Sequence, residues 1–331
     1  MNFKALIINQ QDENFTREVK NIDSSFLKHG NVLVKVDYSS LNYKDGMILK
    51  NGGKLVKEYP HIPGIDFAGT VEDSQSDKFK KGDKVILTGW RVGEIYFGGY
   101  SQYAKVQDDF LVKMPSDIDS KKAMILGTAG LTALMCVLAI QARETILLGE
   151  PVKDVLVTGA TGGVGSVAVL ALSKLGYNVS AVTGKKDKAD YLKSLGAKTI
   201  LDRQEMDQDA RPLDKALYDG VVDTTGGKIL AKALSHTKPN GIVAACGLAS
   251  SFKLETTVMP FLIRGVKLWG IDSVTAPTKR REFLWSQATT YIDFEKLLDG
   301  VEEWSLGDLE KNSSKILKGE IAGRVIVDLN K

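Results

Sequence analysis

The stretch VLVTGATGGVGSVAVLALSKLG, residues 155–176, is an apolar run that breaks into glycines and then resumes as a helix. Ala160, Gly162 and Gly165 fit the spacing GxGxxG at two glycines of three. In that motif the second glycine lets the backbone approach a pyrophosphate. The third lets the helix pack close to the strand, and the helix N-terminus offers unpaired N–H groups. The stretch therefore predicts a dinucleotide-binding turn; a glycine-rich turn without a ligand stays open as an alternative.

The surrounding sequence alternates strand-like and helix-like segments. Apolar runs such as DVLVTG, NVSAVTG, YDGVVDTTG and GIVAACG are separated by helical segments such as KADYLKSLG. This alternation is typical of βαβ units and of a parallel sheet covered on both faces. We expect a doubly wound α/β domain from Ala123 to Ser273. Residues 120–142 predict a long helix that is apolar on most of its circumference and therefore buried.

Residues 1–124 have a different pattern. Short alternating runs with Gly-rich and Asp-rich breaks, and no long helix, predict an irregular β domain. The last stretch, GEIAGRVIVDLNK, is a turn followed by an apolar strand, which we expect to return to this first domain. A length of 331 residues also favours two domains.

Composition excludes several classes of protein. Hydrophobic residues make up 43% of the chain and charged residues 26%, as in a soluble globular protein. Lys and Arg number 44 against 41 Asp and Glu, an excess too small to indicate a nucleic-acid partner. Cys136 and Cys246 do not suggest a disulfide framework. The start lacks a secretory signal and no segment reaches about 18 unbroken apolar residues, so we expect a cytoplasmic protein with no membrane partner.

The choice of nucleotide is expected at the end of the next strand, in AVTGKKDK. Thr183, Gly184, Lys185 and Lys186 stand where an acidic side chain would accept a hydrogen bond from a ribose 2′-hydroxyl, and Arg203 follows the strand after it. A hydroxyl, a glycine backbone and cations suit a 2′-phosphate, which predicts NADP. The alternative is that the two lysines only form a solvated helix start.

The side chains that zinc or acyl-transfer chemistry requires are scarce. The chain has three histidines and two cysteines, with no CxxC or HxxxH pair and no GxSxG motif. A hydride donor without a metal suits an acceptor that carries its own activation, such as an alkene conjugated to a thioester or a ketone. Such a site needs hydrogen-bond donors for an enolate and a proton source, for which a tyrosine or water suffices.

Several strings together resemble a known family. LNYKDGMILKNGG, YPHIPGIDFAGTV, KGDKVILTGWRVGE, FGGYSQYAKV and GTAGLTA are similar to the medium-chain dehydrogenase/reductase superfamily in its zinc-free quinone-oxidoreductase branch. Gly64, Ile65 and Asp66 stand where zinc-dependent members carry GHE. More narrowly, VTGKKDKADYLKSLGA, MPFLIRGVKLWGIDSV and GEIAGRVIVDLN resemble the acrylyl-CoA reductase subgroup, the YhdH/AcuI type.

The resemblance implies an architecture and an activity. The fold would be α/β, with a GroES-like irregular β-barrel domain at residues 1–122 and 274–331 and a Rossmann domain at 123–273. The activity would be NADPH-dependent reduction of acryloyl-CoA to propionyl-CoA, with the nicotinamide in the cleft between the domains and an acyl-CoA as the small-molecule partner. A homodimer is implied as well, and we expect the apolar strand GVKLWGID to join two copies through its edge.

The resemblance also implies site residues, with no metal ligand among them. Tyr43 and Arg324 are the catalytic candidates. The cofactor-binding candidates are Tyr43, Thr161, Gly162, Gly163, Val164, Thr183, Gly184, Lys185, Arg203, Leu248, Ile263 and Ser273. Alternatively, Tyr43 only walls the cleft and Arg324 pairs with a carboxylate of the first domain. Asp45 and Asp66 are expected to cap turns.

Two other functions stay open at this point. The same cofactor could reduce quinones or free enones, because the fold does not choose the acceptor. The chain could also be a nucleotide-binding protein without catalysis.

Overall fold

The computed structural model describes residues 1–146 and 151–331, which form two compact units. The first unit comprises Met1–Thr128, Ser273–Gln287 and Val301–Lys331. The second comprises Ala129–Asp272 and Ala288–Gly300. Compared with the predicted ranges, residues 123–128 and 273 pack with the first unit, and the segment 288–300 packs with the second.

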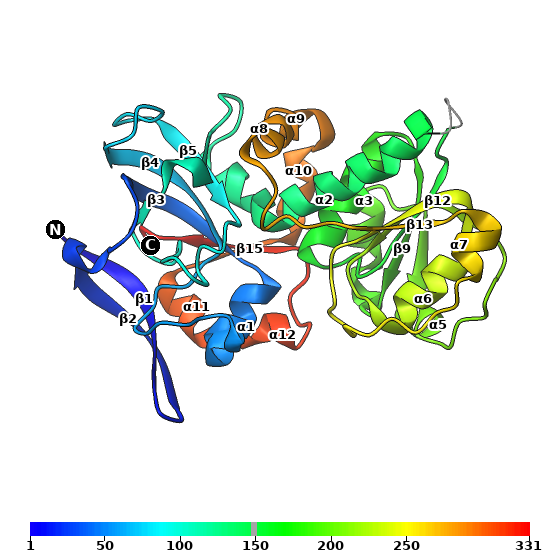
Figure 1. Cartoon of the computed structure of the whole chain (residues 1–331), viewed down its shortest axis with the longest axis horizontal. Helices are drawn as coiled ribbons and strands as arrows, with labels where there is room; N and C mark the ends of the chain where they lie inside the picture. The colour runs from blue at the N-terminus through cyan, green and yellow to red at the C-terminus, as the bar shows by residue number, and fades with distance from the viewer. Residues whose placement is uncertain (147–150) are drawn as a thin grey trace. The chain divides into compact units, whose positions relative to one another are not determined.

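The second unit is built on a parallel sheet (Figure 1). In the described residues its strand order is β10-β9-β8-β11-β12-β13, and each neighbouring pair is parallel. The strands are β8 (Asp154–Val157), β9 (Asn178–Thr183), β10 (Thr199–Asp202), β11 (Tyr218–Asp223), β12 (Thr237–Ala245) and β13 (Lys267–Gly270). The order runs one way from β8 to β10 and the other way from β11 to β13. The carboxyl ends of β8 and β11 are therefore the topological switch point, where doubly wound folds bind their ligands.

Helices cover this sheet because its strands are apolar on both faces. β11 is buried along its whole length, as the strands of parallel sheets commonly are. α3 packs on β8 and β9, while α6 and α7 pack on β12. The helical segments are α3 (Gly163–Lys174), η4 (Lys186–Lys188), α4 (Ala189–Ser194), α5 (Arg203–Met206), α6 (Gly227–Ser235), α7 (Met259–Arg264), α9 (Ala288–Tyr291), α10 (Phe294–Leu297) and η5 (Leu298–Gly300).

The predicted long apolar helix is present as α2 (Ser120–Ile146). Gly127, at φ 52° and ψ −151°, interrupts its helical backbone. By length and composition alone, Ser120–Thr145 could cross a membrane, but 94% of its most apolar window is buried inside the protein. The core helix of a soluble protein has the same properties, and the burial favours that interpretation.

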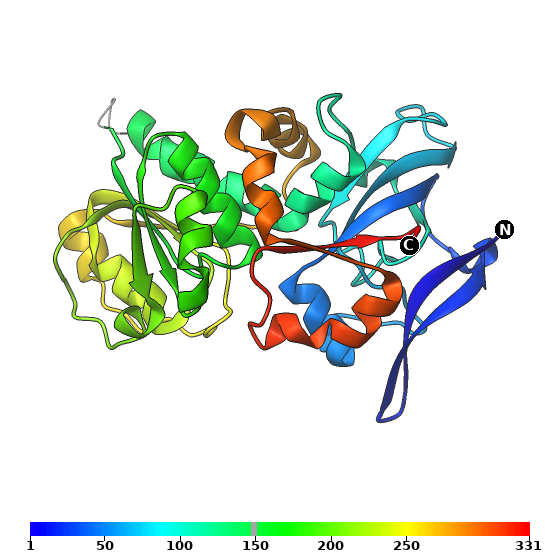
Figure 2. The ribbon, with the colours of Figure 1, turned by 180° about the vertical axis from the view of Figure 1, so that it is seen from behind.

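The first unit is a mainly antiparallel β structure. In the described residues one sheet has the order β14-β15-β3-β4-β5-β7, with β6 paired to β3, and a second sheet is formed by β1 and β2. Figure 2 shows β1 and β2 from behind as a long ribbon. The strands are β1 (Asn2–Gln11), β2 (Asn14–Asp23), β3 (Val32–Leu41), β4 (Asp66–Ser74), β5 (Lys84–Thr88), β6 (Tyr103–Val106), β7 (Leu111–Lys113), β14 (Val301–Trp304) and β15 (Arg324–Asp328).

The last strand confirms a sequence prediction. β15 pairs antiparallel with β3, so the chain returns to the first unit. Leu41, Val325 and Val327 are buried in the core that joins them. The helical segments of this unit are η1 (Ser24–Phe26), α1 (Tyr43–Asn51), η2 (Gly52–Lys54), η3 (Asp108–Phe110), α8 (Thr278–Ser286), α11 (Leu306–Asn312) and α12 (Ser314–Leu317).

Candidate functional site

The glycine turn between β8 and α3 has the shape that a bound pyrophosphate requires. A Cβ added at Gly165 would lie 2.3 Å from the carbonyl oxygen of Gly159 and 2.7 Å from the Cα of Ala160. Only glycine allows α3 to pack this closely on the turn. A Cβ added at Gly162 would contact a single atom, at 3.2 Å, so that face of the backbone is open to a ligand.

The N-terminus of α3 supplies the attraction for an anion. Gly162 is its N-cap residue and no side chain caps the helix. The backbone N–H groups of Gly163 and Val164 lie in the first turn, where a helix has no carbonyl partners of its own and carries its positive dipole end. Thr161, buried beside them, donates to or accepts from Thr183 through their hydroxyls at 3.0 Å. These predicted residues lie together in the second unit and fit a pyrophosphate.

The predicted 2′-phosphate residues also lie together. Thr183 ends β9, and its hydroxyl accepts the backbone N–H of Lys185 at 3.0 Å. A Cβ added at Gly184 would lie 3.3 Å from Nε of Arg203, so the guanidinium rests against the glycine backbone. Burial lowers the pKa of the Lys185 ammonium, and the Asp187 carboxylate opposes that shift. An anion bound here would favour the charged form of Lys185.

A second carboxylate, that of Asp202, lies close to these cations. Asp202 is the register partner of Thr183 across β10 and β9. Its carboxylate pairs with Lys186 at 2.8 Å and accepts the N–H of Gln204 at 2.9 Å, which caps α5. The Asp202 carboxylate is therefore engaged by Lys186 and by the N-terminus of α5. Arg203, the next residue, adds a positive charge at the same end of the strand.

Sequence reasoning missed a buried network at the switch point. The hydroxyl of Thr158, at the end of β8, donates to Oδ1 of Asp223 at 2.6 Å, and Oδ2 of Asp223 accepts the N–H of Gly226 at 2.8 Å. Burial raises the pKa of Asp223, while the hydrogen bonds from Thr158, Gly226 and Thr225 oppose the shift. This network ties the carboxyl ends of β8 and β11 together. The signal in the sequence is the acidic residue that ends the apolar run of YDGVVDTTGG.

The remaining cofactor candidates are more scattered. Leu248 follows β12 at the same end of the sheet and is 55% exposed, and Ile263 in α7 is 64% exposed. Ser273 belongs to the first unit, where its carbonyl oxygen accepts Nη2–H of Arg281 at 2.9 Å.

In the first unit, Tyr43 is the first residue of α1. Asn42 precedes it as N-cap and forms a capping box with Asp45, whose Oδ2 accepts the Asn42 N–H at 3.0 Å. Oδ1 of Asp45 accepts the N–H of Ile65 at 3.0 Å, so the same carboxylate holds the helix start to the loop before β4. Tyr43 itself is 39% exposed, so its ring is accessible from solvent.

Arg324 lies in a buried network rather than at the surface. Its Nη2 donates to the hydroxyl of Ser40 at 2.7 Å, its Nη1 to the side-chain oxygen of Asn42 at 3.3 Å and its Nε to the carbonyl of Ile125 at 3.0 Å. The Ser40 hydroxyl in turn donates to Asp66 at 2.8 Å. The alternative was that Arg324 pairs with a carboxylate of the first domain. In the structure Arg324 is linked to the Asp66 carboxylate indirectly, through the Ser40 hydroxyl.

Asp66 does not cap a turn, and that expectation was wrong. It begins β4, and its carboxylate also accepts Nδ2–H of Asn42 at 2.9 Å and the N–H of Thr128 at 2.8 Å. The adjoining Gly127 is required, because a Cβ there would lie 2.7 Å from the Ser40 hydroxyl and 2.8 Å from Asp66.

The network changes the acidity of Asp45. Burial, and after it the charge of Asp66, raise the pKa of its carboxyl to about 7, against the hydrogen bonds from Asn42 and Ile65. Asp45 is thus a buried carboxyl with a raised pKa, two residues after Tyr43.

The comparisons with known proteins identify the family of this chain. Residues 28–116 match the model of the alcohol dehydrogenase GroES-like domain, and residues 163–288 match that of the zinc-binding dehydrogenase. The acrylyl-CoA reductase AcuI of Ruegeria pomeroyi is 47% identical to this chain over 331 residues, covering 99% of each. The chain belongs to the AcuI/YhdH family of medium-chain dehydrogenases/reductases.

Two solved structures are similar to nearly the whole chain. The yhdH oxidoreductase of Salmonella enterica, in complex with NADP, is 45% identical, with a TM-score of 0.94 and coverage of 98% of this chain and 99% of that one. The yhfP protein of Bacillus subtilis, with NAD bound, is 42% identical, with a TM-score of 0.93 and coverage of 99% of both. The shared fold is therefore compatible with NADP and with NAD. The residues around Thr183 and Arg203 are the candidates for the choice between the two nucleotides.

The donor set of the first unit does not resemble a zinc site. Over residues 1–146 and 151–331, no group of three or more His, Cys, Asp or Glu side chains could hold a metal ion. Asp66 instead accepts hydrogen bonds from serine, asparagine and a backbone N–H. In this member of the AcuI/YhdH family, the residues after Gly64 serve a hydrogen-bond network.

Proposed function

We propose that this chain is an enzyme that reduces acryloyl-CoA to propionyl-CoA with NADPH. The observation that carries the proposal is the 47% identity to the acrylyl-CoA reductase AcuI of Ruegeria pomeroyi across 99% of both chains. Similarity over both domains supports a shared substrate more strongly than similarity of the nucleotide-binding half alone, because function resides in the site rather than in the fold.

NADPH is the cofactor that the second unit fits. Gly162, Gly163 and Val164 would hold the pyrophosphate through backbone N–H groups, and Thr161 would support them. Lys185 and Arg203 would hold the 2′-phosphate, with Thr183 and Gly184 forming the floor. We also retain Leu248, Ile263 and Ser273 as candidates for contacts with the rest of the cofactor.

The chemistry places two demands on the protein. When bound, NADPH would supply a hydride for the β-carbon of the acryloyl group and become NADP⁺, while the π electrons of the C=C bond move toward the thioester carbonyl to give an enolate. A proton on the α-carbon would then complete the reduction, so that the π bond of C=C is replaced by two C–H bonds and a C–C single bond remains. The protein must stabilise the enolate oxygen with hydrogen-bond donors and deliver that proton.

We assign proton delivery to Tyr43, with water as the alternative source. Its phenol carries an O–H group and lies at the accessible start of α1. Arg324 would act as a positioning residue, because each of its three guanidinium nitrogens donates to Ser40, Asn42 or Ile125. By holding Asn42, the N-cap of α1, Arg324 fixes the backbone from which Tyr43 projects.

Steady-state kinetics test the proposed reduction of acryloyl-CoA. With NADPH as donor, kcat/KM is measured for acryloyl-CoA and for a simple quinone. We expect the thioester to be preferred. A higher kcat/KM for the quinone would make the chain a quinone oxidoreductase, and tight NADPH binding without turnover of any activated alkene or quinone would make it a binding protein.

We propose a homodimer formed through the edge of the parallel sheet. β13 is the last strand in the sheet order, and Leu268 and Trp269 on it are 38% and 40% exposed. An apolar edge strand with unpaired backbone groups is suited to pairing with a copy of itself across a two-fold axis. Sedimentation velocity at micromolar concentration should give a dimer; a monomer would refute the proposal.

We also propose that the protein works in the cytoplasm. Cys136 and Cys246 are both free thiols, as expected in a reducing compartment. Fractionation of the native cells, with activity measured in the soluble and membrane fractions, checks this location.

A further inference from the structure

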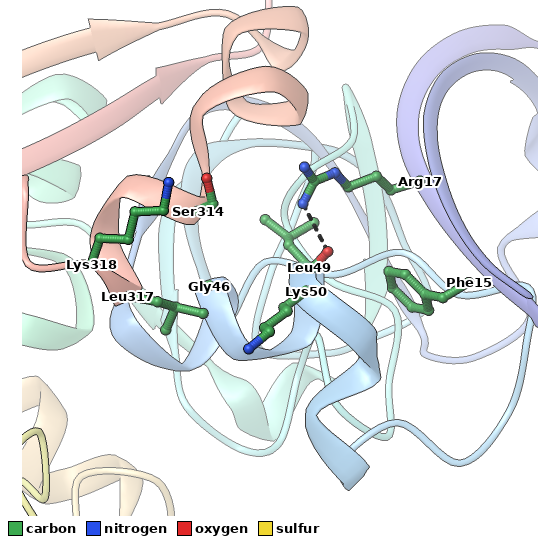
Figure 3. Close-up of a pocket in the computed structure, with 8 residues that line it drawn as sticks. All are labelled: Phe15, Arg17, Gly46, Leu49, Lys50, Ser314, Leu317 and Lys318. Carbon is green, nitrogen blue, oxygen red and sulfur yellow. Dashed lines mark hydrogen bonds between the residues drawn. The ribbon is translucent and has the colours of Figure 1, made fainter. Parts of the chain in front are cut away.

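A groove in the first unit combines positive charge with an apolar floor. It encloses about 550 Å³ between β2, α1 and α12 (Figure 3). Arg17 lies on β2, Lys50 on α1, and Lys318 directly follows α12. Figure 3 shows Arg17 and Phe15 on one side, α1 in the middle, and Ser314 and Lys318 on the other. The groove is assembled from three segments that are far apart in the sequence.

The positive charge in the groove is not neutralised by the protein. No carboxylate lines it. In the part of the chain that the structure describes, Arg17, Lys50 and Lys318 form no ion pair. Three like charges around one cavity repel each other, and a bound polyanion would remove that repulsion.

The groove is also partly organised for binding. Nη1 of Arg17 donates to the carbonyl oxygen of Leu49 at 2.9 Å and to the hydroxyl of Ser313 at 3.3 Å. These bonds fix the guanidinium against the C-terminal half of α1, so that little side-chain freedom is lost on binding a phosphate. Phe15, half-buried, presents a ring on which an aromatic base can stack.

We propose that this groove binds the adenosine 3′-phosphate 5′-diphosphate end of the acyl-CoA substrate. Cations for phosphates and an aromatic ring for the base match that ligand. The same helix connects the groove with the proposed proton donor: α1 begins at Tyr43 and carries Lys50 seven residues later, roughly 10 Å along the helix axis. The pantetheine arm would run between them. This inference rests on the proposed acyl-CoA substrate.

The test separates the phosphate end from the reacting end. KM is measured for acryloyl-CoA and for acryloyl-pantetheine, which has the same thioester without the nucleotide. In the double variant Lys50→Ala/Lys318→Ala, we expect KM for acryloyl-CoA to rise roughly tenfold, the scale of two exposed charge contacts. KM for acryloyl-pantetheine and both kcat values should stay unchanged. These lysines are exposed, so their removal leaves the core intact.

The matched control is Lys315→Ala. Lys315 is exposed on the same helix, α12, but does not line the groove, so its loss should change KM for acryloyl-CoA by less than roughly twofold. Raising the salt concentration should increase KM for acryloyl-CoA more in the wild type than in the double variant.

Direct binding keeps this inference separate from the proposed reaction. Free CoA is titrated by calorimetry into the wild type and the double variant. Weaker binding to the variant supports the groove even if acryloyl-CoA is not reduced, an outcome that would instead refute the proposed function. Equal affinity of both proteins for CoA, or an equal rise of KM for acryloyl-CoA and acryloyl-pantetheine, would overturn the assignment of the groove.

Discussion

Replacing Arg203 with alanine tests the discrimination between NADPH and NADH. The guanidinium lies against Gly184 at the end of β9, where the 2′-phosphate of NADPH is expected. A hydrogen bond to a charged group contributes about 1.5 to 3 kcal/mol, or roughly 10- to 140-fold in Kd. Because Arg203 is exposed and salt screens it, we expect the lower part of that range, roughly 10- to 30-fold.

The assay is a fluorescence titration of both reduced nucleotides at about 0.15 M salt, with Kd compared between wild type and Arg203→Ala. Kd for NADH should change less than roughly twofold, because NADH has no 2′-phosphate for the guanidinium to hold. Lys193→Ala is the control, since it removes an exposed cation of α4 that pairs with Asp190. Equal weakening of NADPH and NADH would show that Arg203 does not contact the 2′-phosphate.

Three further variants address catalysis, packing and pH. Tyr43→Phe should lower kcat roughly 100-fold with little change in the Kd for NADPH; an unchanged kcat would reduce the hydroxyl to a packing role. Gly165→Ala brings a Cβ to 2.3 Å from a carbonyl oxygen, so it should cost about 1 to 3 kcal/mol of stability and weaken NADPH binding. Gly307→Ala, whose Cβ has its nearest contact at 3.7 Å, should leave Tm unchanged or higher. Burial and the charge of Asp66 raise the pKa of Asp45 from 3.8 to about 7. Between these two pH values the folded state keeps a proton that the unfolded state releases, so the stability that Asp45 contributes at low pH is lost as the pH rises through about 7. The Tm difference between wild type and Asp45→Asn should therefore be largest near pH 4 and shrink toward pH 8. His61, whose pKa burial lowers to about 4, makes stability rise with pH, but it is present in both proteins and so cancels in the Tm difference. A Tm difference between wild type and Asp45→Asn that is constant with pH would contradict the raised pKa of Asp45.

The features that the sequence predicted are those that depend on the spacing of residues close together in the chain. The turn at Gly162 and Gly165 is predictable because a phosphate-binding turn needs missing side chains at fixed spacing between a strand and a helix. The helix that begins at Ser120 is predictable because its apolar residues cover most of its circumference. The return of the last strand to the first unit followed from the lack of a helix after it; its pairing partner there, β3, was not predicted.

The features that escaped prediction depend on residues brought together by the fold. The sequence left open that Arg324 pairs with a carboxylate of the first domain. It did not identify Asp66, 258 positions away, or the Ser40 hydroxyl that links the two side chains. The basic groove draws Arg17 and Lys318 to α1 from the two ends of the chain, so no cluster of cations is visible in the sequence. Contacts between elements that are far apart in the sequence, rather than spacing along the chain, form such sites.

The most direct test of the central claim is product analysis with chelator-treated protein. The protein is dialysed against a metal chelator, supplied with NADPH and acryloyl-CoA, and both NADPH oxidation and propionyl-CoA formation are followed. We predict one propionyl-CoA for each NADPH oxidised, at the rate of the untreated protein. An absence of propionyl-CoA, or a rate that returns only when zinc is added, would contradict it.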